Sequence, residues 1–380
     1  MQKKIAIIGA GASGCMAAIV AAKNNCIVTL FETNDLIGKK ILATGNGRCN
    51  ISNNNLSVDH YYSESDVKNN KLIHILDELS FEKTRDFFKE LGLYFTIKES
   101  LAYPKSGQAQ SVVSIIKNAL KRNNISVRLS ERIKKISVTD MEKFVIKTSK
   151  GLEEFDSVII ATGGISSSIS GSDGDGYYFA KQFGHTIVDT CPALVQLKCD
   201  GDFWKQISGV RCEACIALGD CTEYGELQIT DYGISGFPVF QLSLNACRKL
   251  QSNDYLEGYI DFLPDVCEDE LKEILSKHNL QGLLNPKLAE FLFEKYNLNE
   301  DINVIKKFRI IVNGHNGYKN AQVTSGGVSL AEVDTHLQSL KYKGLYFTGE
   351  VLDITGKCGG YNLQWAWSSG YTAGMHASKS

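Results

Sequence analysis

Three glycines near the start of the chain have the spacing of a dinucleotide-binding turn. Gly9, Gly11 and Gly14 follow a short apolar run at residues 4–8 and precede an alanine-rich stretch, so they fit a strand, a turn and a helix. In such a turn the first glycine permits the tight bend, the second admits a pyrophosphate and the third lets the helix pack closely. The spacing predicts a dinucleotide cofactor, and therefore redox chemistry. A glycine turn in a generic α/β domain is the alternative.

An acid and a polar loop extend this prediction. The apolar run at residues 27–31 is expected to be a second strand, and it ends on Glu32, whose carboxylate can accept hydrogen bonds from an adenosine ribose. The glycine- and amide-rich segment 36–53 follows, with Lys40 and Arg48 available to neutralise phosphate charge. Such a loop favours an extended cofactor such as FAD. The alternative is a solvated surface loop.

A second glycine-rich segment, residues 349–374, contains two of the three tryptophans. Leu363, Trp367 and Gly370 recur with helical spacing after its glycine loop. Small residues make one side of this helix thin, and amides at its N-terminus can face the negative charge of a reduced flavin. We expect the tryptophans to pack and the glycines to leave room for the cofactor. A helix that only closes the core is the alternative.

Two other motifs could suggest metal or redox chemistry. CEAC, residues 212–215, has Cys221 nearby but no second cysteine pair or paired histidines to complete a zinc site. Asp173 and Asp175 resemble part of a calcium loop, but the bidentate glutamate of that loop is missing. We expect Asp175 instead to cap a helix that ends at Gly184. The sequence therefore predicts no metal site.

The elements that position these residues follow from hydrophobic periodicity. Residues 60–125 are mostly helical in pattern, and residues 126–160 form a small meander that returns to a buried strand ending in ATGG. Residues 194–262 contain short strands and turns, and residues 265–309 look helical. We expect a discontinuous cofactor domain at residues 1–190 and 320–380, interrupted by a β-rich domain at 191–319 whose helical segment spans about 264–309.

Composition narrows the class of protein. The 380 residues suffice for two or three domains, and their hydrophobic fraction of 43% can supply the cores. A net charge of -2 without a basic block argues against nucleic-acid binding. The eleven cysteines are odd in number and irregularly spaced, which argues against a secreted disulfide framework. No apolar run suggests a membrane span, and the apolar start fits a strand, turn and helix better than a signal peptide. We expect a cytoplasmic protein.

Together these segments resemble the BaiN/YhiN-type flavoproteins, bacterial FAD-dependent oxidoreductases that include aminoacetone-oxidase-like proteins. The matching motifs span nearly the whole chain in order, and GRCN with GGYNLQWAWSSG is the most specific pair. The others are GAGASG, KKILATGNGRCNISN, YPKSGQA, ATGG, GSDGDGYYFAKQFGHTI, PALVQL, YGISG, TSGGV and GLYFTGEVLD. The resemblance implies an α/β fold with a Rossmann-like FAD-binding domain of the glutathione-reductase class. It also implies that a β-barrel-like domain and a small helical segment interrupt that domain.

The same resemblance implies the FAD contacts. They lie in the glycine turn, at the acid, in the polar loop, after the ATGG strand and around the C-terminal glycine loop. The residues are Gly9, Ala10, Gly11, Ser13, Gly14, Glu32, Lys40, Gly47, Arg48, Cys49, Asn50, Ala161, Thr162, Gly163, Gly349, Glu350, Gly360, Tyr361, Asn362 and Leu363.

Activities of the family imply NAD(P)H-linked reduction of an enone through flavin N5, or oxidation of a small aminoketone. We expect an FAD-dependent oxidoreductase of a small organic substrate that reduces a carbon–carbon double bond. NADH or NADPH would bind transiently, because no second GxGxxG turn provides a nucleotide domain. The alternatives are an oxygen-dependent oxidase of a small amine or aminoketone, and a non-enzymatic flavin redox sensor.

The catalytic candidates lie in loops that are expected to face the flavin ring: Cys49, Tyr103, Thr324 and Ser325. His315 fits a turn histidine better than a catalytic one. Cys49 and Cys358 both fall in these loops, so a redox disulfide between them is a further hypothesis. No proton donor follows from the sequence.

Overall fold

The computed structural model describes residues 2–65, 68–167, 171–298 and 300–379, and it divides into two compact units. Unit 1 comprises Met1–Thr190 and Val323–Ser380, and unit 2 comprises Cys191–Gln322. The first boundary, between residues 190 and 191, is the one expected from the sequence. The second, between residues 322 and 323, lies three residues after the expected one. The strands on either side of the insertion, β12 (Ile187–Ala193) and β19 (Val323–Val328), pair with each other.

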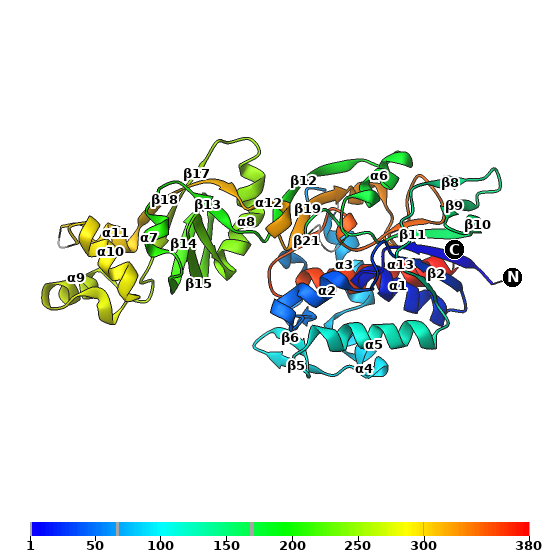
Figure 1. Cartoon of the computed structure of the whole chain (residues 1–380), viewed down its shortest axis with the longest axis horizontal. Coiled ribbons are helices and arrows are strands. Elements are labelled where there is room, and N and C mark those ends of the chain that lie inside the picture. Colours follow the sequence, from blue (N-terminus) through cyan, green and yellow to red (C-terminus); the bar gives the residue numbers. More distant parts are fainter. Residues whose placement is uncertain (1, 66–67, 168–170, 299, 380) are drawn as a thin grey trace. The chain divides into compact units, whose positions relative to one another are not determined.

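Unit 1 is built on a parallel sheet with the strand order β20-β11-β1-β2-β7 (Figure 1). The strands are β1 (Lys4–Ile8), β2 (Ile27–Phe31), β7 (Ser126–Arg128), β11 (Ser157–Ile160) and β20 (Leu345–Phe347). Ile5 and Ile7 of the central strand are fully buried, because elements cover both faces of such a sheet. The strands run in one direction, so their C-terminal ends lie along a single edge, where ligands of open α/β sheets bind.

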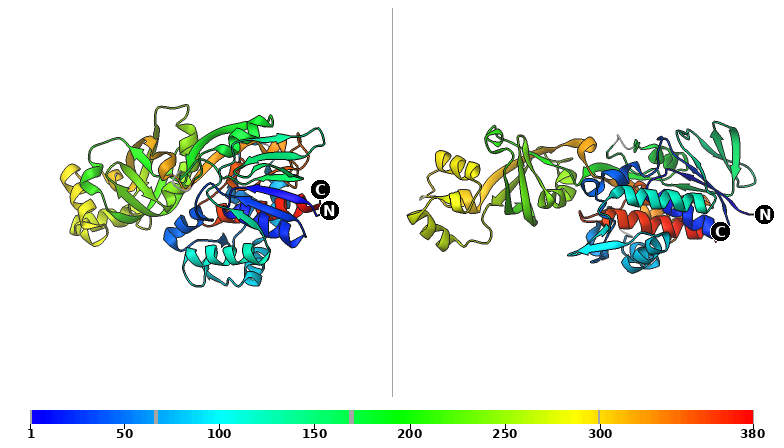
Figure 2. Two further views of the ribbon diagram at one scale, coloured as in Figure 1. Left: turned by 45° about the vertical axis from the view of Figure 1, so that its right-hand side comes forward. Right: turned by 60° about the horizontal axis from the view of Figure 1, so that its bottom comes forward.

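The helices α1 (Ala12–Lys23) and α13 (Tyr361–Lys379) pack closely against each other. A Cβ atom on Gly370 would overlap the backbone carbonyl oxygen of Ser13, and one on Gly374 would lie 2.6 Å from that of Ala17. The glycines therefore let the backbones of the two helices approach. In the right-hand view of Figure 2, α13 (red) and α5 (Ala109–Arg122, teal) extend in nearly the same direction.

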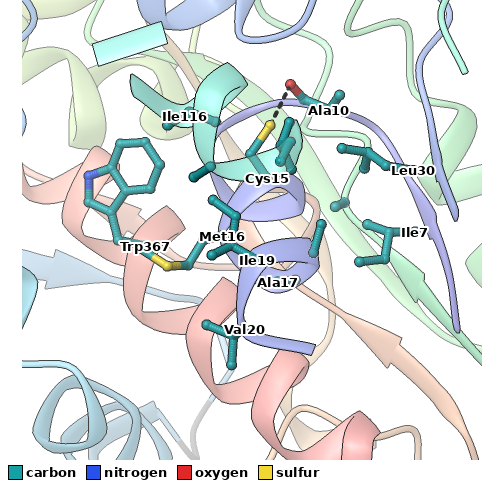
Figure 3. Close-up of a cluster of buried hydrophobic side chains, with 14 of the residues drawn as sticks. Ile7, Ala10, Cys15, Met16, Ala17, Ile19, Val20, Leu30, Ile116 and Trp367 are labelled. Carbon is teal, nitrogen blue, oxygen red and sulfur yellow. Dashed lines mark hydrogen bonds between the residues drawn. The ribbon is translucent and has the colours of Figure 1, made fainter. Parts of the chain in front are cut away.

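The main core of unit 1 surrounds α1. Figure 3 shows Met16 of α1 pointing towards Trp367 of α13, with Ile7 and Leu30 of the sheet on the other side of α1. The Cys15 thiol donates a hydrogen bond to the Ala10 carbonyl oxygen at 3.3 Å. This core holds the glycine turn and the last helix in fixed positions.

The remaining elements of unit 1 include three small sheets, with the strand orders β10-β9-β8, β3-β6-β5 and β21-β4. The elements are α2 (Lys39–Ala43), β3 (Ser52–Asn53), β4 (Tyr61–Tyr62), α3 (Lys68–Glu78), α4 (Phe81–Leu91), β5 (Phe95–Lys98), β6 (Leu101–Pro104), β8 (Ile136–Val138), β9 (Phe144–Thr148), β10 (Gly151–Phe155), α6 (Asp175–Gln182) and β21 (Thr355–Gly356). The expected meander is confirmed for β8, β9 and β10, but its first segment, residues 126–128, is β7 of the parallel sheet instead. No helix among the described residues combines the length and hydropathy of a bilayer span.

Residues 60–125 are mostly helical as expected, with α3, α4 and α5, and they also contain the hairpin of β5 and β6. One local prediction in unit 1 is wrong. Asp175 does not cap α6, because Gly174 with φ 88° takes the N-cap position and Asp175 lies in the first turn. The Asp175 carboxylate instead pairs with Arg132 at 2.6 Å. Gly184, with φ 73°, follows the helix end as predicted.

Unit 2 is a closed barrel with the strand order β13-β16-β15-β14-β17-β18, which confirms the β-rich insert. Its strands are β13 (Leu197–Cys199), β14 (Arg211–Leu218), β15 (Cys221–Thr230), β16 (Gly233–Gly236), β17 (Leu256–Asp261) and β18 (Phe308–His315). Its helices are α7 (Trp204–Ile207), α8 (Phe237–Lys249), α9 (Glu268–Lys277), α10 (Pro286–Lys295), α11 (Asn303–Lys306) and α12 (Gly317–Asn320). The helix α8 was not predicted, because its region was assigned to short strands.

The two cysteines of the CEAC motif do not face each other in this barrel. Cys212 and Cys215 lie on β14, where residues an odd number apart point to opposite faces. The Cys221 sulfur accepts a hydrogen bond from the Asn245 side chain at 3.1 Å. None of the described cysteines is in a disulfide bond.

Candidate cofactor and active site

The glycine turn after β1 has the predicted division of roles. Gly9 has φ 104°, and a Cβ atom on it would overlap the Ala161 carbonyl oxygen at the end of β11. A Cβ atom on Gly14 would overlap the Gly9 carbonyl oxygen, so this residue sets the close packing of α1 against β1. Gly11, the N-cap of α1, has no atom within 4 Å of its Cβ position. The open space lies at the helix N-terminus, where backbone amides can bind phosphate.

Glu32 is fixed at the end of β2. Its Oε2 accepts a hydrogen bond from the Ala10 amide at 2.8 Å. Its Oε1 accepts from the backbone and side-chain nitrogens of Asn34, at 2.8 and 2.7 Å. An ionised carboxylate has about four acceptor positions, so these bonds leave capacity for a ribose hydroxyl. The acid is thus held beside the glycine turn, as a dinucleotide site requires.

The polar loop after α2 has a run of left-handed residues. Gly45, Asn46, Gly47 and Cys49 have φ values of 56°, 52°, 82° and 61°. Non-glycine residues with such φ values are sparsely populated, and they are concentrated at functional sites. Gly47 has no atom within 4 Å of its Cβ position, and the Arg48 side chain is exposed. The loop therefore presents backbone amides and one cation to an anionic ligand.

Lys40 has a partner that sequence reasoning did not find. Its ammonium pairs with Glu350 Oε2 at 2.5 Å, and Glu350 Oε1 accepts from the Thr324 amide at 2.9 Å. The ion pair joins the polar loop to the segment after β20. Lys40 therefore serves first to hold two cofactor loops together, and a phosphate contact would add to that role.

The C-terminal glycine loop is anchored from several sides. Gly359 and Gly360 have φ values of 116° and 94°, and a Cβ atom on Gly360 would lie 2.5 Å from the Ser52 carbonyl oxygen. The Asn362 side chain accepts from the Gly356 amide at 2.8 Å and donates to the Gly356 carbonyl at 2.7 Å. The Asn53 side chain donates to the Gly359 carbonyl at 2.8 Å. These glycines are needed for packing against β3 as well as for exposing amides before α13.

Asn50 and Tyr361 complete this anchoring. With the Asn50 amide oriented to satisfy its neighbours, its oxygen accepts from the Gly360 amide at 3.1 Å. The Tyr361 hydroxyl donates to the Asn55 carbonyl at 3.2 Å. The His60 ring lies against Tyr361, with ring centroids 4.5 Å apart. Sequence analysis missed His60 and Asn53, and no local pattern marked either residue.

The tryptophans of α13 contribute more than packing. The Trp365 indole donates to the Gly349 carbonyl, and the Trp367 indole donates to the Ile51 carbonyl, each at 3.0 Å. Both carbonyls belong to segments that flank the cofactor loops. The bulky residues therefore fix those segments, while Gly370 and Gly374 bring α13 against α1.

The other predicted contacts lie at the same edge of the sheet. Ala161, Thr162 and Gly163 follow β11, and Gly163 has φ 74°. The Ser13 hydroxyl donates to the Thr348 carbonyl at 3.4 Å, and a Cβ atom on Gly349 would lie 2.5 Å from that hydroxyl. Leu363 is partly buried against the core of unit 1.

Tyr103 is the catalytic candidate best placed for chemistry. It lies on β6, half-buried, near Arg48 and Cys358. Burial raises the pKa of its hydroxyl; Arg48 lowers the pKa and Cys358 raises it further, and the net shift is upward. Its ring lies close to Gly45 of the strained loop, since a Cβ atom there would be 3.8 Å from Tyr103 Cε1. A protonated phenol therefore stands among the loops that are predicted to face the cofactor.

The other catalytic candidates make contacts that support the fold rather than a reaction. The Thr324 hydroxyl accepts from the amides of Ile165 and Ser166, at 2.9 and 3.0 Å, so it positions the segment after β11. Ser325 is fully buried in β19. His315 belongs to unit 2, and its Nδ1 accepts from the Gly317 amide at 3.2 Å. His315 is the last residue of β18 rather than the turn residue that was expected.

The thiols of Cys49 and Cys358 are expected to be inert near neutral pH. Burial raises the pKa of each to about 11. At pH 8 roughly one thiol in a thousand is then ionised, and the thiolate is the nucleophile. We expect iodoacetamide to modify both residues on the order of 100-fold more slowly than the exposed Cys267, with rates that rise about tenfold per pH unit. Peptide mass spectrometry of the folded protein measures this, and equal rates at Cys49 and Cys267 would contradict it.

These observations fit a dinucleotide with a flavin end. There is open space at the Cβ position of Gly11, Glu32 is held beside the glycine turn, and the strained loop with Arg48 offers further donors. A parallel Rossmann-type sheet that carries these features defines a flavoenzyme, and the protein is an FAD-dependent oxidoreductase. The chain belongs to the family described as "HI0933-like protein Rossmann domain", which it matches over residues 3–376.

Three known proteins show how the chain relates to others. It is 37% identical to the 3-dehydro-bile acid delta(4,6)-reductase of Clostridium scindens, over 100% of both chains. It is 31% identical to the ribosomal RNA dihydrouridine synthase of Haemophilus influenzae, over 98% of each chain. The structure of 3-ketosteroid delta1-dehydrogenase from Sterolibacterium denitrificans aligns over 100% of both chains with a TM-score of 0.58 and 13% identity. At that identity the likeness shows the fold alone.

Proposed function

We propose that the protein reduces a carbon–carbon double bond conjugated to a carbonyl group in a small organic substrate, with NADH or NADPH as the donor. The proposal is supported by the full-length identity of 37% to a protein that is named as a reductase of a bile acid with 4,6 double bonds. A relative with 31% identity is named for forming a dihydro-nucleoside, which is also addition of hydrogen across such a bond.

The single observation that carries the proposal is the placement of Tyr103. Reduction of an enone requires a hydride at one carbon and a proton at the other, so a proton donor must stand near the reacting bond. A tyrosine hydroxyl is protonated at neutral pH, and burial raises the pKa of Tyr103 further, so the proton is present for transfer. Oxidation of an amine has no comparable need for an acid that donates a proton to carbon.

We assign the phosphates of FAD to the turn from Gly9 to Gly14 and its adenosine ribose to Glu32. The flavin end is assigned to the loops around Gly47 and Gly360. When bound, FAD supplies hydride transfer at N5. The N-terminus of α13 supplies amides and positive dipole character, which stabilise negative charge there. Tyr103 holds the proton to be delivered, and Arg48 and Asn50 contribute positive charge and anchoring at the same loops.

Dihydrouridine formation in ribosomal RNA is a second candidate, which the identity of 31% over 98% of each chain favours. We propose a small organic substrate rather than RNA, because the net charge of the chain is -2 and its sequence contains no block of basic residues. The two candidates share the chemistry and differ in the substrate, so a direct comparison of acceptors separates them.

The test follows the flavin absorption of the holoprotein under anaerobic conditions. We expect NADH or NADPH to bleach the flavin band, and a 3-oxo bile acid with 4,6 double bonds to restore it. Replacing Tyr103 with phenylalanine should slow the restoration by about 100-fold and leave the bleaching unchanged, because a general acid contributes about that factor. The matched control is Tyr94→Phe, since Tyr94 is 57% exposed just before β5.

Other outcomes of this test would favour a different function. Restoration by unmodified ribosomal RNA and by no enone would select the RNA candidate. A flavin that resists NADH and NADPH but is bleached by aminoacetone, then restored by oxygen, would select the oxidase. Equal rates for wild type and Tyr103→Phe would remove Tyr103 from the proton-transfer role.

A further inference from the structure

A cluster of three histidines and one glutamate lies in unit 1, away from the glycine loops. His74 and Glu78 are one turn apart on α3, His376 is near the end of α13, and His336 follows the β19 region. Ligand atoms of His74, Glu78 and His336 all lie within 4.8 Å of one another. His376 Nε2 is 2.9 Å from Glu78 Oε1, and its ring stacks on that of His336 with centroids 3.6 Å apart.

Two ring nitrogens in this cluster have no hydrogen-bond partner among the residues that the structure describes. They are His74 Nε2 and His336 Nδ1, and both are shielded from solvent. His74 Nε2 is 3.6 Å from Glu78 Oε1, which is too long for a hydrogen bond. Leaving a shielded polar atom unpaired costs roughly 1–3 kcal/mol, so its persistence calls for a ligand.

The charges of the cluster suit a cation. His336 offers an imidazole nitrogen within 4.8 Å of the ligand atoms of His74 and Glu78, and imidazole is the commonest protein ligand of metal ions. Glu78 adds a carboxylate, one of whose oxygens accepts a hydrogen bond from Thr372 while the other lies 2.9 Å from His376 Nε2. The last turns of α3 and α13 add partial negative charge from their carbonyl groups.

We propose that His74, Glu78 and His336 bind a divalent transition metal ion of the Zn²⁺ type. Two imidazoles and a carboxylate suit Zn²⁺, and a three-ligand set leaves a position for water. His376 and Thr372 hold the two oxygens of Glu78, as outer partners hold the carboxylate in metal sites. Asp334 fixes the third ligand, because its Oδ1 accepts from the His336 and Gln338 amides at 2.8 and 2.9 Å.

Because this site is distant from the glycine loop, we expect it to stabilise the fold rather than to take part in the reaction. Tyr361 begins α13 at the glycine loop and His376 is fifteen residues further, which is roughly 22 Å along a helix. The ion would join α3, α13 and the segment at His336, which are far apart in the sequence. It should therefore raise the stability of unit 1 and leave flavin reduction unchanged.

The test titrates Co²⁺ and Zn²⁺ into holoprotein that has been freed of metal with a chelator. We expect one Co²⁺ per chain, with visible ligand-field bands beyond the flavin absorption and no thiolate charge-transfer band. Zn²⁺ should displace Co²⁺ and raise the midpoint of thermal unfolding. His336→Gln and His74→Gln should each weaken binding by on the order of 100-fold, and His376→Gln by roughly 10- to 100-fold. His278→Gln, at an exposed position in unit 2, is the matched control.

Four results would overturn the proposal. One is the absence of saturable Co²⁺ binding to the wild type. Another is a thiolate charge-transfer band, which would assign the ion to cysteines. The third is equal affinity in wild type, His74→Gln and His336→Gln. The fourth is a wild-type stability that follows pH but not metal concentration, with this pH dependence reduced in the histidine variants, which would show that the cluster only binds protons. The visible absorption of the bound flavin, measured in parallel, shows whether each variant is folded around its flavin.

Discussion

Replacing Gly11 with valine should give a folded protein that does not retain FAD. Gly11 has φ -75°, which valine adopts, and no atom lies within 4 Å of its Cβ position. The chain therefore accepts the side chain, apart from a loss of about 1 kcal/mol at a helix N-cap. The same side chain fills the space through which a pyrophosphate approaches the backbone. We expect FAD affinity to fall by on the order of 1000-fold, because the pyrophosphate loses both its hydrogen bonds to the backbone amides and its close contact with the turn.

The measurement compares flavin content after purification, and FAD titration of the apoprotein, with circular dichroism as the check on folding. Gly282→Val is the control, since Gly282 also has open space at its Cβ position and lies in unit 2. A Gly11→Val protein with full flavin content would show that the cofactor does not approach this turn. If the valine variant is unfolded, Gly11→Ala repeats the test with a smaller group.

Gly370→Val should lower the free energy of unfolding of unit 1 by about 3 kcal/mol, at the upper end of overpacking costs. The added atoms would overlap the Ser13 carbonyl oxygen and reach within 3.0 Å of Met16 Cβ. These groups belong to α1, which the sheet and the core hold in place, so neither helix can move aside easily. Valine lacks the helix penalty of glycine, and the gain of a few tenths of a kcal/mol is too small to compensate.

Urea unfolding followed by tryptophan fluorescence measures this loss, because Trp365 and Trp367 lie on the same helix as Gly370. Gly374→Val should give a similar loss, since its Cβ position lies 2.6 Å from the Ala17 carbonyl oxygen. Gly282→Val should change stability little. An unchanged midpoint in Gly370→Val would mean that the two helices do not approach at this point.

The parts of the fold that follow from local sequence could be predicted. The turn from Gly9 to Gly14 needs only a strand, three glycines and a helix, which lie within one short segment. The β-rich insert could also be predicted, because strand and turn signals recur through residues 194–262. The hairpin of β5 and β6 was missed because each strand has four residues and the flanking helices dominate the periodicity. Asp175 was misplaced because Gly174 can take a left-handed N-cap position.

Contacts between distant residues could not be predicted. The pair of Lys40 and Glu350 joins residues 310 positions apart, and neither residue has a local signal for the other. The histidine cluster shows the same limit: spacing of one turn relates His74 to Glu78, but His336 and His376 come from elsewhere in the chain. The prediction of no metal site rested on local motifs alone. Asn53 and His60 act only through the glycine loop that the fold brings to them.

The contact between α1 and α13 also determines when unit 1 can complete its folding during translation. The helix α1 leaves the ribosome before the barrel of unit 2, and α13 leaves it after that barrel. Until α13 emerges, Met16 and the neighbouring apolar residues of α1 lack the partner that covers them. The barrel of unit 2 has its own core and is complete earlier, so it can fold while unit 1 still waits for its closing helix. The nascent chain is therefore expected to need a chaperone for its N-terminal half and not for the barrel.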